Sequence, residues 1–121
     1  MPKISRPARL KGVTHRIETG CGKMYVIVNR DEKTNEILEV FASLGKGGGC
    51  AKAQSEAITR AITLGLRYGV PLAEYTKQLC DIKCHTPGDY YGEGDKKSRV
   101  ESCADAIAKV LQAEEQGEVK K

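Results

Sequence analysis

The sequence has few aromatic residues and no long apolar run. Its 121 residues contain no tryptophan, one phenylalanine and five tyrosines. No apolar stretch approaches the roughly 18 residues that a membrane-spanning helix needs, and the first residues lack the apolar centre of a secretory signal. We therefore expect a cytoplasmic protein with no membrane partner. The lack of aromatic residues and of any known reader motif also argues against specific nucleic-acid binding.

The charge of the chain is only mildly positive. Lysine and arginine total 20 against 16 aspartates and glutamates, which gives a formal net charge of +4. Much of the excess lies within the first eleven residues, at Lys3, Arg6, Arg9 and Lys11. We predict a basic arm over residues 1–11, a single domain over 12–112 and a charged tail over 113–121. A basic arm can hold an acidic partner or can simply be solvated.

Three segments near the start of the chain have the pattern of β-strands. Alternating and β-branched residues predict strands over residues 12–18, 23–29 and 36–44. Short turn-like links between them favour an antiparallel meander. In the third segment the alternation predicts that one set of side chains faces the core. That set is Leu38, Val40, Ala42 and Leu44.

The second half of the sequence has the pattern of helices. Helical spacing predicts helices over residues 51–68 and 72–79, and Gly69 suits the position just after the first. Ser102 followed by Asp105 is a capping arrangement for a third helix. Together these segments predict an α+β fold, in which a three-stranded antiparallel sheet packs with two or three helices. The inward residues expected on the first helix are Ala57, Ile58, Ala61, Ile62, Gly65 and Leu66.

A glycine-rich segment separates the strands from the helices. A helix N-terminus carries unpaired N–H groups and partial positive charge, and glycines let the backbone approach a ligand closely. The segment is therefore a candidate anion site, although it fits neither a Walker A loop nor the dinucleotide fingerprint. The alternative is a strand-to-helix connection that binds nothing. The residues proposed to bind are Lys46, Gly47, Gly48 and Gly49.

Two arginines on the first predicted helix could serve the same ligand. Arg60 and Arg67 lie seven residues apart, on one helix face, where both could bind phosphate in bidentate fashion. The alternative is a solvated face, on which Arg60 pairs with Glu56. Arg60 stands roughly 15–20 Å along the helix from the glycines, too far for one mononucleotide to reach both. We therefore expect a ligand held between the subunits of a homo-oligomer.

The five cysteines could include metal ligands. Cys80, Cys84, His85 and Cys103 are residue types that bind zinc, and Cys50 or His15 would have to supply the fourth ligand. Their irregular spacing leaves open the alternative that Cys80 and Cys103 are buried as small hydrophobic residues. There is no C-x-x-C motif to indicate redox chemistry, and no motif supports a catalytic cysteine.

Several of these segments together resemble the TSCPD domain, over about residues 7 to 112. That domain is found near the C-terminus of adenosylcobalamin-dependent ribonucleotide reductases and in short stand-alone proteins. The signature differs here, because Glu101-Ser102-Cys103-Ala104-Asp105 stands where Thr-Ser-Cys-Pro-Asp is expected. The other matching segments are Gly12-Val13-Thr14, Gly22-Lys23-Met24-Tyr25-Val26, Glu39-Val40-Phe41, Gly45-Lys46-Gly47-Gly48, Glu56-Ala57-Ile58 with Arg60, Leu66-Arg67-Tyr68-Gly69-Val70, and Cys84.

The resemblance implies an accessory domain rather than an enzyme, since nothing in the chain resembles the reductase's catalytic barrel. It gives weight to Cys84 and Cys103 as zinc ligands and to the glycine-rich segment as a phosphate site. We expect a non-enzymatic binding protein for a nucleotide-like anion. It would be associated with a ribonucleotide reductase, or would act as a phage-type sponge that sequesters a signalling nucleotide in anti-defence. The alternative is a structural module that docks on a reductase, with zinc as a stabiliser.

Overall fold

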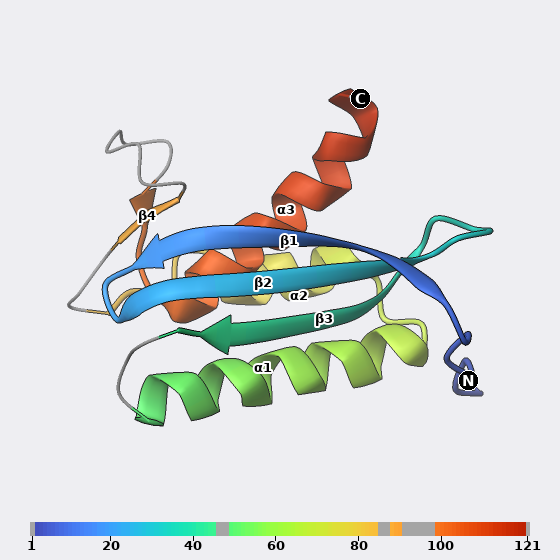
Figure 1. The fold of residues 1–121 in the computed structure, drawn as a ribbon, viewed down its shortest axis with the longest axis horizontal. Coiled ribbons are helices and arrows are strands. Elements are labelled where there is room, and N and C mark those ends of the chain that lie inside the picture. Colours follow the sequence, from blue (N-terminus) through green and yellow to red (C-terminus); the bar gives the residue numbers. More distant parts are fainter. Residues whose placement is uncertain (1, 46–48, 85–87, 91–98, 121) are drawn as a thin grey trace.

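The computed structural model of the chain describes residues 2–45, 49–84, 88–90 and 99–120. In this part of the chain, strands form one antiparallel sheet in the order β3-β2-β1-β4-β5, and helices pack against it (Figure 1). None of the described helices has the length and apolar character needed to cross a membrane. The elements are β1 (Leu10–Thr19), β2 (Gly22–Asp31), β3 (Ile37–Leu44), α1 (Gly49–Arg67), α2 (Leu72–Leu79), β4 (Gly88–Tyr90), β5 (Arg99–Val100) and α3 (Cys103–Lys120).

The three long strands confirm the predicted antiparallel meander, and with the three helices they confirm the α+β fold. β1 and β2 pair without a break from Leu10 opposite Asp31 to Thr19 opposite Gly22. β2 lies between β1 and β3, and its inward Met24, Val26 and Val28 are buried. The short strands β4 and β5, which the sequence pattern did not indicate, extend the sheet beyond β1.

The hydrophobic core lies between the sheet and the helices. α1 runs alongside β3, whereas α2 and α3 lie behind the sheet in the view of Figure 1. The inward face predicted for β3 is confirmed for Leu38, Val40 and Leu44, which are buried. The buried stripe of α3 consists of Ala106, Ile107, Val110 and Leu111, each without solvent exposure.

Helix α1 packs beside the edge strand as well as over the core. The Thr63 hydroxyl accepts a hydrogen bond from the Val40 N–H at 3.0 Å and donates one to the Val40 carbonyl at 2.9 Å. These backbone groups point away from β2, where an uncovered edge would offer them to another chain. Thr63 therefore satisfies part of the sheet edge within the molecule.

This position of α1 corrects the inward face expected from the sequence. Ala57 and Ala61 are exposed, while Ser55 and Thr59 are buried. Ile62 and Leu66 are buried, as expected. Thr63, which bonds the edge of β3, is also a short polar residue, and a search for apolar spacing does not find a helix face of this kind.

Two glycines set the end of α1 and its contact with α2. Gly69 has a φ of 94°, and its N–H donates to the Leu66 carbonyl while the Val70 N–H donates to the Gly65 carbonyl. This is a Schellman ending, and it confirms Gly69 as the residue after the helix. A side chain at Gly65 would meet the Tyr75 hydroxyl at 1.7 Å, so this glycine permits the close packing of α1 and α2.

Glu114 fixes the far part of α3 to the sheet. Its carboxylate accepts hydrogen bonds from His15 at 2.6 Å and from Arg30 at 3.2 Å, and Arg30 also donates to the Glu114 carbonyl at 3.0 Å. Burial raises the pKa of Glu114, but the hydrogen bonds and charges of His15 and Arg30 lower it by more, so it lies below 4.5. The second residue of the segment expected to be a charged tail is thus bonded to β1 and β2.

We predict that Glu114→Gln lowers the free energy of unfolding at pH 7 by about 1.5–3 kcal/mol, the range for hydrogen bonds to charged groups. Because the folded pKa of Glu114 is depressed, its stabilisation is complete above pH 4.5 and is lost as the pH falls through the folded pKa. The difference in free energy of unfolding between wild type and Glu114→Gln should therefore become smaller toward pH 3. Urea unfolding at both pH values measures it, with the exposed Glu115→Gln as control. An equal deficit at both pH values would contradict this assignment.

Candidate functional site

A basic groove lies between α1, the outer face of β3 and the N-terminal arm. It has a volume of about 170 Å³, and among its lining residues are three cations, a phenyl ring and a leucine. The structure brings Arg60 and Arg67 together here, as their spacing suggested, and adds Lys3 from the arm. The lining residues are Lys3, Phe41, Arg60, Thr63, Leu64 and Arg67.

The two arginines have different partners. Arg60 forms an ion pair with Glu56 at 2.8 Å, so the alternative weighed from the sequence is present in the structure. Its side chain is 75% exposed, and exposed pairs of this kind contribute about 0–1 kcal/mol. Arg67 donates from Nε to the Ile4 carbonyl at 2.7 Å, a bond that does not use its terminal amino groups. Both guanidinium groups can therefore take an anion at small cost.

Apolar surface accompanies the positive charge. Phe41 and Leu64 line the groove and are 42% and 51% exposed. An aromatic ring offers a flat face to a base or another planar group. The hydroxyl of Thr63 in the same lining is bonded to Val40. The groove thus combines cations for an anionic group with a ring for a planar one.

The N-terminal arm is attached at two points beside this groove. Ile4 donates its N–H to the Arg67 carbonyl at 2.8 Å and accepts the Arg67 Nε bond in return. Arg6 donates from Nε and Nη2 to the two carboxylate oxygens of Glu39, which is 3% exposed. The sequence pattern did not predict the pairing of Arg6 with Glu39, for which the available signal was one acidic residue within a mainly apolar strand.

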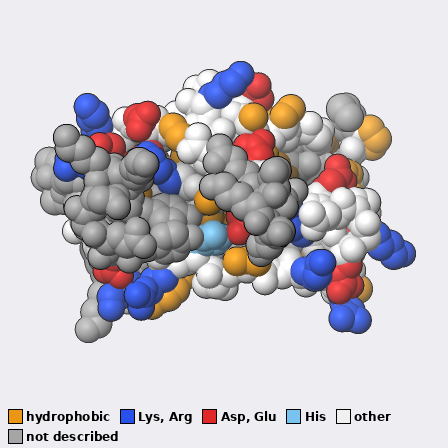
Figure 2. All heavy atoms as spheres, turned by 90° about the horizontal axis from the view of Figure 1, so that it is seen from above, with side chains coloured by type: hydrophobic (Ala, Val, Ile, Leu, Met, Phe, Trp, Pro, Cys, Tyr) orange, Lys and Arg blue, Asp and Glu red, His pale blue; other side chains and the backbone are white. Residues whose placement is uncertain are grey.

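On the face of the molecule shown in Figure 2, positive charge is dispersed. On the face seen in Figure 2, the described Lys and Arg side chains are scattered among acidic ones and do not gather in one patch. A broad basic surface is the electrostatic footprint of nucleic-acid binding, and this face does not show one.

The glycine-rich segment is only partly described. Lys46, Gly47 and Gly48 lie outside the described residues, and Gly49 is the exposed first residue of α1. Arg60 stands eleven residues further along the helix, about 16 Å at 1.5 Å per residue. A separate cavity of about 540 Å³ lies beside the start of this segment. It is lined by Glu18, Gly22, Lys23, Tyr25 and Gly45.

The two cysteines proposed as metal ligands have different surroundings. Cys84 is exposed, and its N–H donates to the Glu101 carbonyl at 2.9 Å, which places it near the start of α3. The Cys103 thiol contacts the Thr19 hydroxyl at 3.9 Å. Burial raises the pKa of Cys103, the bond with Thr19 lowers it in part, and the neighbouring Cys21 raises it.

Within the described residues, no three or more His, Cys, Asp or Glu side chains are grouped to hold a metal ion. His85 lies outside that part of the chain, and His15 bonds Glu114. Burial raises the pKa of Cys80, which favours its neutral thiol over the thiolate that binds metals. Zinc at Cys84 and Cys103 stays a prediction, and it needs further ligands.

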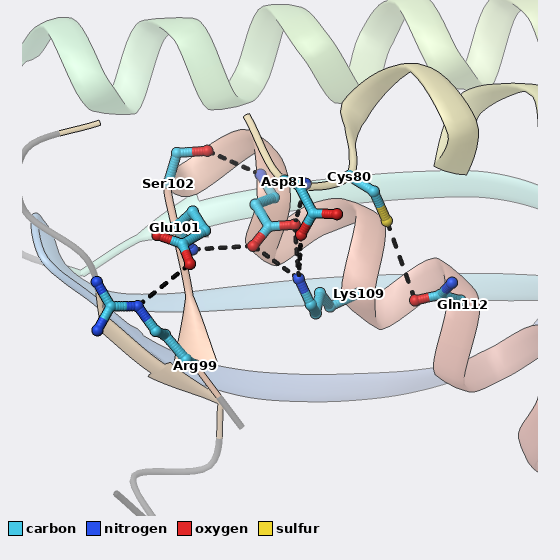
Figure 3. A network of polar contacts seen from close by, with 8 residues as sticks. Cys80, Asp81, Arg99, Glu101, Ser102, Lys109 and Gln112 are labelled. Atoms are coloured by element: carbon cyan, nitrogen blue, oxygen red, sulfur yellow. Dashed lines mark hydrogen bonds and ion pairs between the residues drawn. The ribbon is translucent and has the colours of Figure 1, made fainter. Parts of the chain in front are cut away.

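The signature-like segment, which spans the start of α3, holds a buried carboxylate. Asp105 has no solvent exposure and accepts the Asp81 N–H at 2.7 Å and the Glu101 N–H at 2.9 Å, one on each oxygen. Lys109 donates to both oxygens at 2.8 Å. Figure 3 shows the partners converging from the end of α2, from β5 and from α3. This carboxylate fixes the positions of three segments.

Ser102 of the same segment caps the N-terminus of α3. The Asp105 N–H donates to the Ser102 hydroxyl at 3.0 Å, which confirms the predicted cap. Burial lowers the pKa of Lys109, but its bonds to Asp105 and the charge of Asp105 raise it by more, so the pKa lies above 10.5. Lys109 therefore stays charged over the physiological range. A carboxylate bonded to two backbone N–H groups and to a charged lysine stabilises the start of α3.

Asp105→Asn should destabilise the fold by about 3–5 kcal/mol, the cost of breaking a buried ion pair. An amide has one acceptor oxygen, so its NH₂ group would face one of the two backbone donors. Asp81→Asn is the matched control, since its side chain is 78% exposed and asparagine tolerates the φ of 64° there. Urea unfolding of both variants measures the difference. Equal stability of Asp105→Asn and wild type would contradict the role given to this carboxylate.

Comparison with known proteins agrees with the resemblance. The family model of the TSCPD domain matches residues 1–115. The chain is 33% identical over 86 residues to a vitamin B12-dependent ribonucleotide reductase of Agrobacterium fabrum, and 29% identical over 91 residues to that of Bradyrhizobium diazoefficiens. These matches cover 71% and 75% of this chain but 7% of each relative. No solved structure matches the chain. This chain belongs to the TSCPD domain family.

Proposed function

We propose that this chain is a non-enzymatic binding protein for a phosphate-bearing, nucleotide-like anion held in the basic groove. One observation carries the proposal: Lys3, Arg60 and Arg67 line the same groove as the exposed ring of Phe41. These cations come from the arm, from the fourth turn of α1 and from its last turn, so their convergence depends on the fold.

The groove fits this ligand class in charge and in size. Arginine binds phosphate oxygens through paired N–H groups, and such charged hydrogen bonds are about twice as strong as neutral ones. The volume of about 170 Å³ is below the range of about 300–1,000 Å³ for sites that enclose drug-sized ligands, so the groove would hold the phosphate end of a nucleotide and not the whole molecule. The remainder of a nucleotide would then lie over Phe41 and Leu64.

The lining residues support binding more than catalysis. They supply cations, apolar surface and one hydroxyl, and that hydroxyl is bonded to the edge of the sheet. General acid–base catalysis uses a titratable group near the operating pH, whereas lysine and arginine stay charged at neutral pH. The described lining therefore holds an anion without activating a nucleophile.

The relatives indicate which anions to test first. They are named as ribonucleotide reductases, whose substrates are nucleotides, so we propose that the ligand belongs to this class. A small binding protein that is separate from the reductase would either deliver the nucleotide to that enzyme or sequester it. The second candidate is a module that docks on a reductase, and it is favoured by the match of this chain to a small part of those enzymes.

Calorimetric titration with adenosine triphosphate and with inorganic phosphate tests the proposal. Arg60→Ala and Arg67→Ala should each weaken nucleotide binding by about 1.5–3 kcal/mol, the range for a hydrogen bond to a charged group. That loss is roughly 10- to 150-fold in Kd. Lys52→Ala, an exposed cation of α1 outside the groove, is the matched control and should bind as wild type. Unchanged affinity in both arginine variants would contradict the proposal and would favour the docking module.

A further inference from the structure

We infer that residues 3–6 form a strap that completes the basic groove, and that the buried Glu39 holds this strap in place. Figure 1 shows the N-terminus beside the C-terminal end of α1. The role of the strap in ligand binding rests on the proposed function, whereas its attachment rests on the contacts alone.

The first attachment joins the strap to a residue that also lines the groove. Ile4 and Arg67 exchange two hydrogen bonds, at 2.8 Å from the Ile4 N–H and 2.7 Å from Arg67 Nε. The second bond orients the guanidinium of Arg67, whose terminal amino groups remain for an anion. When the strap binds to α1, it therefore also fixes the orientation of Arg67.

The second attachment supplies the stronger hold. Glu39 is 3% exposed, and its carboxylate accepts hydrogen bonds from both Arg6 and Asn29, the latter at 2.9 Å. Burial raises the pKa of Glu39, but bonds from Arg6 and Asn29 and the charges of Arg6 and Arg67 lower it by more. A buried carboxylate without its cation is costly. Arg6 therefore stays bound to Glu39, because its release would leave the buried carboxylate without a cation.

Lys3 depends on both attachments for its place in the groove. It is next to Ile4 in the chain and three residues from Arg6, and Phe41 lies on the same face of β3 as Glu39. Ordering a free backbone segment costs conformational entropy at every residue. Because the docked strap is already ordered before a ligand binds, ligand binding does not have to overcome this entropic cost. Arg6 and Glu39 are thus positioning residues for Lys3 and Arg67.

A double-mutant cycle on adenosine triphosphate binding tests the coupling. Lys3→Ala and Arg6→Ala should each weaken binding about tenfold, and the double variant should bind no more weakly than Arg6→Ala alone. Arg9→Ala is the matched control, because this cation of the same arm pairs with Glu32 and not with Glu39. If Lys3→Ala kept its full effect in the Arg6→Ala background, Lys3 would not depend on the strap and the inference would fail.

Hydrogen exchange of the Ile4 amide, followed by NMR, tests the strap without any ligand. Arg6→Ala and Glu39→Gln should speed this exchange at least tenfold, and Arg9→Ala should leave it unchanged. Arg6 is 46% exposed, so its variant should keep the fold even if Glu39→Gln does not. Unchanged exchange in Arg6→Ala would overturn the strap. Faster exchange in Arg6→Ala, combined with a wild type that binds no nucleotide, would support the strap and contradict the proposed function instead.

Discussion

The packing of the helices depends on the buried carboxylate of Asp105. A carboxylate without access to water must find donors inside the protein, and this one takes them from Asp81, two residues after α2, from Glu101, directly after β5, and from Lys109. It therefore fixes where α2 ends and where α3 begins. The apolar stripe of α3 follows from that starting point and covers the sheet.

The groove depends on a different constraint, the need to cover the backbone of the edge strand. Thr63 meets the N–H and carbonyl of Val40, so α1 lies along β3 with its arginines beside the strand's outer face. The same outer face carries Phe41 and, two residues before it, Glu39. The contact between α1 and the edge of β3 thus brings the arginines of α1 next to Phe41 and Glu39 of β3.

The sequence predicted what depends on neighbours along the chain. Periodicity located the long strands and helices, and local chemistry identified Gly69 as a helix end and Ser102 as a cap. It did not predict pairs that are distant in sequence, such as Arg6 with Glu39, 33 residues apart, or His15 with Glu114, 99 apart. Such pairs leave no local pattern. Lys3 joined Arg60 and Arg67 only through those contacts, and the predicted homo-oligomer and zinc stay predictions.

The central claim is that a phosphate-bearing ligand binds in the groove of Lys3, Arg60 and Arg67. Backbone amide chemical shifts recorded by NMR during titration with adenosine triphosphate test it most directly. The account predicts that the largest saturable changes cluster around Phe41, Thr63 and Arg67. Changes centred on Lys23, Tyr25 and Gly45, which line the separate cavity beside the glycine-rich segment, would contradict it, as would the absence of any saturable change.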